Sequence, residues 1–232
     1  MGLAAKKQDA TEARLAALSL PSGAGWADAA RVEAVSRFRA MGLPDRRDEY
    51  WRFTRPDDLN LPKAPEAAIF DPQEAPVYSD IDRLQIVFRD GVFDPEASDD
   101  LSLEGIEIER LATATTKDIH WSKDIYGVLE ARGQNPVARP FAALNTAFAT
   151  DGIVIRATGQ VSKPVHLRYL HEKIDSDAIL HFVIRVEPGA NLTVLENGPA
   201  AARFNKCMEV DVADTGIFNH IRTQGRDHER RA

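Results

Sequence analysis

The sequence predicts an α+β protein, in which an N-terminal helical region is followed by the first coils of a parallel β-helix. The first forty residues place their apolar side chains with a helical period, whereas from residue 152 onward apolar and polar side chains alternate as they do in strands. Three strand runs reach a glycine (Gly159, Gly189 and Gly216), at intervals of 30 and 27 residues. Short strands repeated at such intervals are typical of a solenoid. A meander of antiparallel hairpins has the same periodicity and stays open as an alternative.

Two amphipathic helices are expected before residue 42. Pro21 stops the first, and Asp28 is expected to cap the second. Gly42 and Pro44 follow the last apolar position and end the second helix. The predicted apolar faces are Thr11, Leu15 and Leu18 in the first helix and Val32, Val35, Phe38 and Met41 in the second.

Between these helices and the repeats, a surface connection and a small α/β segment are expected. Five prolines between residues 55 and 80 exclude a regular helix or a central strand there. Asp90-Gly91 is a tight-turn dipeptide after a strand run at 84–88, which predicts a hairpin. A further strand is expected at 106–111, and helices at 122–132 and 139–149. The predicted units are residues 1–54 (helical region), 55–80 (proline-rich connection), 81–150 (small α/β segment), 151–222 (start of the β-helix) and 223–232 (polar tail).

Stacked coils predict which strand residues face each other. Arg185 and Asp211 occupy matching positions 26 residues apart and are expected to be outward-facing neighbours. Opposite charges across a ladder contribute about 0.2–1 kcal/mol. Arg156 is expected on the other side of Arg185, where both side chains must reach solvent.

The composition restricts the class of protein. The chain has 232 residues, 44% of them hydrophobic and 28% charged. It contains no apolar run of the roughly 18 residues needed to cross a bilayer, and its first residues lack the features of a secretory signal. The net charge of −7 argues against a general nucleic-acid binder. The single cysteine, Cys207, excludes an intramolecular disulfide and an all-cysteine metal site, so a cytoplasmic location is the simplest interpretation.

Two blocks carry a resemblance to a known family. Residues 42–54 read GLPDRRDEYWRFT, which is too polar for a core strand and too aromatic for a disordered linker. Residues 140–155 read PFAALNTAFATDGIVI. In this order both blocks resemble the SufB/SufD family of iron–sulfur cluster assembly factors, and the first resembles the segment that follows the N-terminal helices of SufD proteins. The resemblance implies that a helix gives way, near residue 152, to the first coil of a right-handed β-helix.

The resemblance also implies a role and partners. The chain is expected to be part of a non-catalytic scaffold subunit that assembles with SufB-like and SufC-like subunits, the latter an ATPase. No catalytic, cofactor-binding or metal-binding residue is carried over, because the family's reactive cysteine belongs mainly to SufB and its cluster-related histidine is expected beyond residue 232. Family members are usually longer, so the chain is expected to be an N-terminal portion whose partner-binding regions lie beyond residue 232. Its third coil would then expose an open edge.

Cys207 is the first candidate for chemistry, since a lone thiol can be a nucleophile, a persulfide acceptor or a metal ligand. If Met208 points inward, Cys207 points outward or lies in the turn before the strand, where Lys206 would lower its pKa. A small, half-buried packing role is the favoured interpretation.

The six histidines show no spacing typical of a metal site, with neither an i, i+4 pair nor an HExxH motif. Stacked coils are expected to bring His166 near Thr193 and Asn219 in an outward polar row. The chain is therefore predicted to bind neither iron nor zinc stoichiometrically. Solvated or hydrogen-bonded side chains are expected at His120, His166, His171, His181, His220 and His228.

Carboxylates offer an alternative function. The pairs Asp57-Asp58 and Asp99-Asp100 lie in loops, where turn or cap roles are expected. Glu209 and Asp211 form the only such pair on one predicted strand, which leaves a carbohydrate-active β-helix enzyme as the alternative. The chain contains no phosphate-binding loop motif that would indicate an ATPase.

The aromatic residues 50–53 leave a further alternative, a pure interaction module. Arg52 could stack on Trp51 or reach a partner's carboxylate. Packing is the favoured interpretation, because Trp51 and Phe53 would point the same way in an extended chain and hold the connection against the domain.

Overall fold

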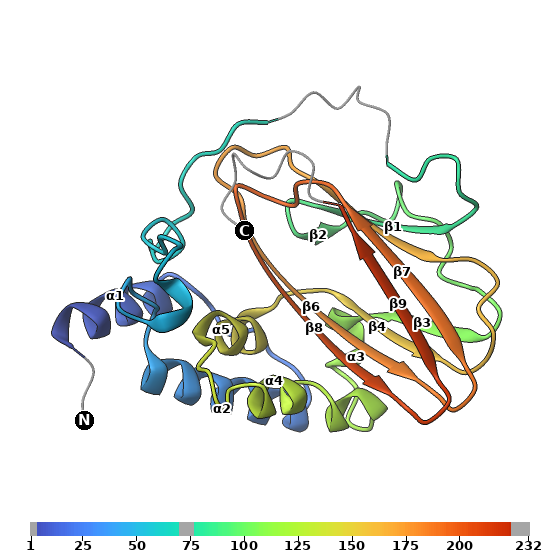
Figure 1. Cartoon of the computed structure of the whole chain (residues 1–232), viewed down its shortest axis with the longest axis horizontal. Helices are drawn as coiled ribbons and strands as arrows, with labels where there is room; N and C mark the ends of the chain where they lie inside the picture. The colour runs from blue at the N-terminus through green and yellow to red at the C-terminus, as the bar shows by residue number, and fades with distance from the viewer. Residues whose placement is uncertain (1–3, 70–76, 224–232) are drawn as a thin grey trace.

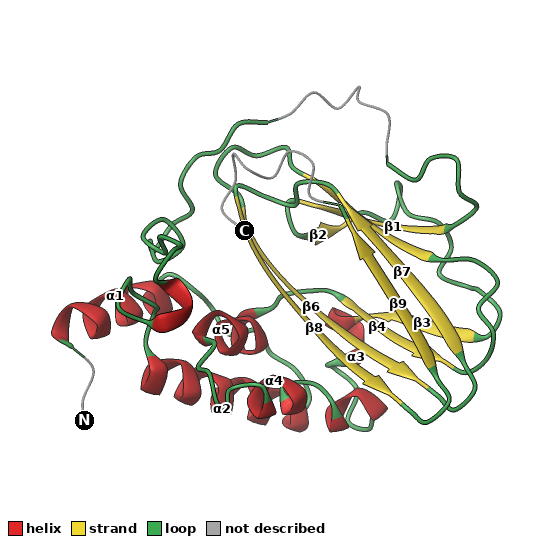
Figure 2. Ribbon diagram, in the orientation of Figure 1, coloured by secondary structure: helices red, strands yellow, loops and turns green. Residues whose placement is uncertain are grey.

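The molecule has a layer of helices beside two β-sheets that pack face to face (Figures 1 and 2). A computed structural model describes residues 4–69 and 77–223. Its helices are α1 (Ala5–Ala16), α2 (Gly25–Met41), α3 (Leu111–Ala114), α4 (Val128–Arg132) and α5 (Pro140–Phe148), with 3₁₀ turns η1 (Glu49–Trp51) and η2 (Trp121–Asp124). Its strands are β1 (Leu84–Arg89), β2 (Val92–Phe93), β3 (Ile106–Arg110), β4 (Ile153–Ala157), β5 (Val165–Leu170), β6 (Asp177–Val186), β7 (Asn191–Asn197), β8 (Arg203–Val212) and β9 (Ile217–Arg222).

The strands after residue 150 alternate between the two sheets. β4, β6 and β8 pair in parallel in one sheet, while β5, β7 and β9 pair in parallel in the other. Each pair of successive strands therefore forms one coil, and the coils stack along the sheets (Figure 1). Parallel neighbours exclude the antiparallel meander, and the α+β class with β-helix-like coils is confirmed. The right hand of the coil stays a prediction.

The preceding strands extend both sheets. β1 and β2 form the expected hairpin, with Asp90 and Gly91 at positive φ (50° and 81°). β1 also pairs in parallel with β5, and β3 pairs antiparallel with β4. The strand orders are β2-β1-β5-β7-β9 and β3-β4-β6-β8.

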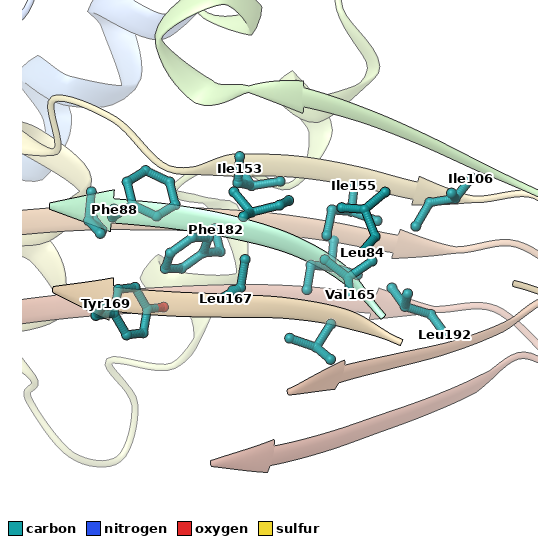
Figure 3. Packing of buried hydrophobic residues seen from close by; sticks show 14 of the residues in the cluster. Leu84, Phe88, Ile106, Ile153, Ile155, Val165, Leu167, Tyr169, Phe182 and Leu192 are labelled. Carbon is teal, nitrogen blue, oxygen red and sulfur yellow. The ribbon is translucent and has the colours of Figure 1, made fainter. Parts of the chain in front are cut away.

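Apolar side chains fill the space between the sheets (Figure 3). Inward positions alternate along each strand, as Val165, Leu167 and Tyr169 do in β5. The Phe88 ring packs against Tyr169 and Phe182, with centroid distances of 6.3 and 6.0 Å. Because burying one such side chain contributes roughly 1.5–3 kcal/mol, this core is the main source of stability.

The outer face of the β3-β4-β6-β8 sheet is covered by helices. Val154, Ile179 and Val183 on this face pack with Phe38 of α2 and Leu144 of α5. The sheet is therefore buried on both faces, which explains why β6 is almost entirely buried along its length.

The predicted register is confirmed. Arg185 pairs with Asp211, and Arg156 pairs with Arg185, on adjacent strands. The Arg185 Nε atom lies 3.3 Å from Asp211 Oδ2, and Arg156 Nε lies 2.7 Å from Glu187 Oε1. Each guanidinium thus has its own carboxylate, which offsets the contact between like charges.

The helical region corrects three expectations. α2 begins at Gly25, so Asp28 lies in its first turn and does not cap it. Val32 is 62% exposed, because smaller residues such as Ala27 and Ala34 set the buried face of α2. The predicted helix over 122–132 is broken at Gly127, whose φ of 72° belongs to the left-handed region. η2 and α4 flank this glycine instead.

The third coil, formed by β8 and β9, has no further strand beside it among the described residues. Val212, Ile217 and Ile221 are exposed there. That this edge of the coil is open stays a prediction. Within residues 4–69 and 77–223, no helix is long and apolar enough to cross a membrane.

Gly152, just before β4, is expected to tolerate no side chain. Its φ is 152°, and an added Cβ would lie 1.7 Å from the backbone oxygen of His181 in the next coil. Gly152→Ala should lower the free energy of unfolding by roughly 3–5 kcal/mol, measured by urea denaturation, because two backbones must separate. The control is Gly25→Ala, where no atom lies within 4 Å of the added Cβ, and there the change should stay within about 0.5 kcal/mol. Equal stability of the two variants would contradict the close contact between coils.

Candidate functional site

Strand β8 carries charged side chains on both of its faces. Since side chains alternate along a strand, Phe204, Lys206 and Met208 point between the sheets, while Cys207 and Glu209 point toward the helices. Two buried ionic clusters result, an outer cluster around Glu209 and an inner cluster that contains Lys206. These two clusters, with a third around Asp177 that includes Arg203 of β8, form the candidate site.

Glu209 is the centre of the outer cluster. Its carboxylate accepts the backbone N–H of Gly127 at 2.6 Å and that of Glu130 at 2.7 Å, where α4 begins. His181 of β6 lies on the neighbouring strand, with Nε2 2.7 Å from Glu209 Oε2. Both side chains are buried, so the carboxylate connects the start of α4 to two strands of the sheet.

Both ring nitrogens of His181 have a hydrogen-bond partner. Its Nδ1 lies 3.0 Å from Asn145 Oδ1. Asn145 Nδ2 donates to the backbone oxygens of Leu180 and Asn205, which fixes its Oδ1 as the acceptor. Both ring nitrogens of His181 therefore face side-chain oxygens, and the ring joins Asn145 to Glu209 in one buried network.

A second carboxylate extends the outer cluster into the helical layer. Glu130 Oε2 lies 2.5 Å from Arg37 Nη2 of α2 and accepts a hydrogen bond of 3.1 Å from Thr146 Oγ1 of α5. The Tyr126 hydroxyl donates to the backbone oxygen of Thr146 at 2.6 Å, and burial raises its pKa to about 12. The outer cluster thus connects α2, α4 and α5 to β6 and β8.

Cys207 lies beside the outer cluster, within β8 and not in the turn before it. Burial raises the pKa of its thiol, and the charges of Glu209 and Glu130 raise it further. Lys206 points to the opposite face and opposes this shift only slightly, so the expected lowering of the pKa is wrong. The thiol stays protonated near neutral pH, and the packing role is the one that fits.

Glu196 of β7 is the centre of the inner cluster, between the two sheets. Lys206 Nζ lies 2.7 and 2.6 Å from its two carboxylate oxygens. From β9, His220 Nε2 and Arg222 Nε lie 3.5 and 3.8 Å away. Burial raises the pKa of Glu196, but the His220 hydrogen bond and the charge and hydrogen bond of Lys206 outweigh it and hold the pKa below its usual value. Charged groups thus replace apolar ones inside this coil.

Asp177, at the start of β6, joins two arginines from distant elements. Its Oδ2 lies 2.8 Å from Arg14 Nη2 of α1 and 2.6 Å from Arg203 Nη2 of β8. Arg14 also donates to the backbone oxygen of Pro62 and Arg203 to that of Leu61, at 2.8 and 2.6 Å. The first helix, the proline-rich connection and the coils are held together at this point.

His166 does not form the expected outward row. It is buried between Arg83 Nε at 2.9 Å and Asn197 Oδ1 at 2.5 Å, and burial lowers its pKa. Thr193 and Asn219 face each other at 3.4 Å without it, because His166 lies on the same outer face but pairs with Leu195, two residues further along β7.

Among the described residues, the other histidines form no metal site. His120 and His171 bind neighbouring polar groups, and His228 lies outside the described residues. Across the two described ranges, no three His, Cys, Asp or Glu side chains are grouped to hold a metal ion. That the chain binds neither iron nor zinc stays a prediction.

The paired carboxylates have structural partners. Asp57, Asp99 and Asp100 accept hydrogen bonds from an arginine or from backbone N–H groups, as expected of turn and cap residues. Glu209 and Asp211 do not form an open pair, because Glu209 is buried under α4 while Asp211 is exposed beside Arg185. These two residues therefore cannot flank a glycosidic bond.

The aromatic residues 50–53 form a turn and not an extended strand. Trp51 packs against Phe141 of α5, with the ring centroids 5.5 Å apart. Phe53 is 93% exposed, so the expectation that both rings point the same way is wrong. Arg52 stacks on Phe53 and not on Trp51, with Cζ 5.5 Å from the ring centroid.

Reasoning from the sequence missed three of the buried carboxylates in these clusters, together with their arginine partners. Glu196 follows Leu192 and Val194 in an inward row, and a charge in such a row is a usable signal of a buried ionic partner. Glu130 and Asp177 have no comparable local signal, because their cations come from α2, α1 and β8.

Comparison with models of protein families matches residues 22–167 to the SufBD protein N-terminal region. The match covers more than half of the chain, from the residues before α2 through the aromatic turn to β5. A search of curated proteins gave no match.

Removing the buried Glu209 carboxylate should cost more than removing the exposed carboxylate in the same strand. Glu209→Gln replaces an acceptor oxygen by an amide group that donates, so one of the buried groups bound to Glu209 loses its acceptor. The free energy of unfolding should then fall by roughly 2–3 kcal/mol. The control Asp211→Asn removes only the exposed pair with Arg185 and should cost at most about 1 kcal/mol. Denaturant unfolding measures both, and similar losses would show that the Glu209 hydrogen bonds contribute no more than a surface pair.

The Asp177 cluster should make stability fall in acid. Burial raises the pKa of Asp177, but the hydrogen bond from Arg203 and the charges of Arg14 and Arg203 outweigh it and lower the pKa. The resulting stabilisation is complete above the unfolded-state pKa of about 3.9 and is lost as the pH falls through the folded-state value. Asp177→Asn should therefore be less stable than the unaltered chain at neutral pH, and thermal unfolding should show this difference shrink below about pH 4. A constant difference down to strong acid would contradict the assignment.

Proposed function

Because the chain belongs to the SufB/SufD family of iron–sulfur cluster assembly proteins, we propose that it is the N-terminal part of a SufD-like subunit. In this proposal the subunit is non-catalytic and forms part of the scaffold on which the cluster is assembled. Its partners are SufB-like and SufC-like subunits, and ATP hydrolysis in the SufC-like subunit reshapes the scaffold. The proposed location is the cytoplasm, where a lone thiol such as Cys207 stays reduced.

The state of Cys207 is the observation that favours a SufD-like over a SufB-like subunit. A cysteine that transfers sulfur reacts as a thiolate, which requires a lowered pKa and access to solvent. Burial and two carboxylates raise the pKa of Cys207 instead, and the neighbouring Lys206 is bound to Glu196. This thiol suits packing, as a non-catalytic subunit requires.

The buried carboxylates support a structural role as well. Glu130, Asp177 and Glu196 each bind a cation from another element, and Glu209 accepts two backbone N–H groups of α4, so these carboxylates stabilise the fold and are not open to a substrate. The rival function, a carbohydrate-active enzyme, requires two carboxylates on an open face. Glu209 and its strand neighbours do not provide them.

Complementation of a strain that lacks the gene tests the proposal. The unaltered gene and Cys207→Ser should restore the activity of iron–sulfur enzymes equally, because the thiol takes no part in sulfur transfer. An affinity tag on the gene product should co-purify the SufB-like and SufC-like subunits. Failure of Cys207→Ser at normal abundance would contradict the non-catalytic role and favour a SufB-like subunit.

Two further outcomes separate the rivals. If iron–sulfur enzymes keep full activity after deletion and neither subunit co-purifies, the chain is an interaction module without a role in cluster assembly. Release of reducing sugars from glycans by the purified protein would favour the carbohydrate-active enzyme.

A further inference from the structure

The turn after α2 exposes aromatic and arginine side chains together. Phe53 is 93% exposed and Tyr50 is 64% exposed, three residues apart in the segment 46–55. Single exposed apolar residues are ordinary on a protein surface, but two large rings in one short segment form a patch. The same segment carries three exposed arginines, Arg47, Arg52 and Arg55. We call residues 46–55 the aromatic–arginine turn.

The aromatic–arginine turn is anchored to the helical layer. The Trp51 ring packs at 74° to that of Phe141 in α5. Asp48 Oδ2 accepts from Lys7 Nζ of α1 at 3.0 Å and from the backbone N–H of Asp45 at 2.9 Å. A surface that is ordered before binding loses little conformational entropy when a partner arrives.

A cleft of about 220 Å³ lies beside the aromatic–arginine turn. Its walls include apolar groups of Met41, Tyr50, Trp51, Val137 and Pro140 and the charged side chains of Lys7, Asp48 and Glu49. Small-molecule sites usually enclose roughly 300–1,000 Å³. The cleft is therefore small for an independent ligand, and it suits one apolar side chain of a larger partner.

Arginines supply positive charge beside the two exposed rings. Arg46 pairs with Asp57, and Asp48 pairs with Lys7. Three exposed arginines and one glutamate remain inside the segment 46–55, and Asp45 and Asp58 flank it, so the positive charge is local to the arginines next to the rings. A complementary partner surface is consequently acidic.

We propose that the aromatic–arginine turn docks an acidic segment of another protein, which inserts one apolar side chain into the cleft. Tyrosine, tryptophan and arginine are the side chains enriched where interfaces gain most of their binding energy. The Arg52 guanidinium lies over the Phe53 ring, so one exposed unit offers an apolar face together with donors for a carboxylate. The inference does not depend on which subunit of the family the chain represents.

Titration of the full chain with short synthetic peptides tests this proposal. The first peptide alternates glutamate and leucine, the second has glycine in place of leucine, and the third has lysine in place of glutamate. The glutamate–leucine peptide should shift the amide resonances of Tyr50 and Phe53 and the indole resonance of Trp51. The other two peptides should bind at least about tenfold more weakly, because each lacks one half of the required chemistry.

Exposed substitutions with matched controls locate the site. Phe53→Ser and Arg52→Glu should each weaken binding of the glutamate–leucine peptide about tenfold. Two controls make the same types of change elsewhere on the surface. Ile119→Ser replaces an apolar side chain that is 87% exposed, and Lys123→Glu reverses an exposed positive charge. Both variants should bind the peptide with unaltered affinity. All four positions are on the surface, so each variant should retain the amide spectrum of the folded protein.

Several results would overturn the proposal. Equal binding of the lysine peptide, or an equal loss of affinity in the two controls, would remove the basis for an acidic partner. Binding of oligothymidine at the same resonances, with no binding of the glutamate–leucine peptide, would assign the turn to single-stranded nucleic acid. Self-association that Phe53→Ser abolishes would assign it to a second copy of the chain.

Discussion

Burial of the β3-β4-β6-β8 sheet on both faces is the constraint on which the other features depend. One face meets the second sheet and the other meets the helices, so a polar side chain on either face requires a partner from the protein itself. His181 and Glu209 meet this requirement toward the helices, and Lys206 meets it between the sheets with Glu196. The same pairs determine where the helical layer and the third coil lie.

The strands and their register could be predicted from the sequence because they depend on the local alternation of apolar and polar side chains. Once side chains alternate, a glycine turn fixes the length of each coil, and residues such as Arg185 and Asp211 come opposite each other. Helix boundaries were less accessible. Gly127 interrupts a helical pattern because α4 must begin where Glu209 can accept its first N–H groups, and that carboxylate lies 82 residues further along the chain.

The partners of the buried charges could not be predicted from the sequence. An alternating pattern shows on which face of the sheet a side chain lies, but it does not show which element covers that face. Asp177 binds an arginine 163 residues before it and another 26 residues after it. Cys207 shows the same limit. Its neighbour Lys206 suggested a lowered pKa, yet adjacent residues in a strand point to opposite faces, and the residues that share the face of Cys207 are carboxylates.

Each of the three ionic clusters connects a different set of elements. The outer cluster joins helices to the sheet, the Asp177 cluster joins α1 and the proline-rich connection to the coils, and the inner cluster joins β7, β8 and β9. Apolar packing alone would allow these elements to slide, whereas a buried charge is stable only with its partner in place. These three clusters are directed toward the interior of the protein. The aromatic–arginine turn is different, since Arg52 and Phe53 remain exposed on an anchored segment, and this separation lets a partner bind there without disturbing the frame.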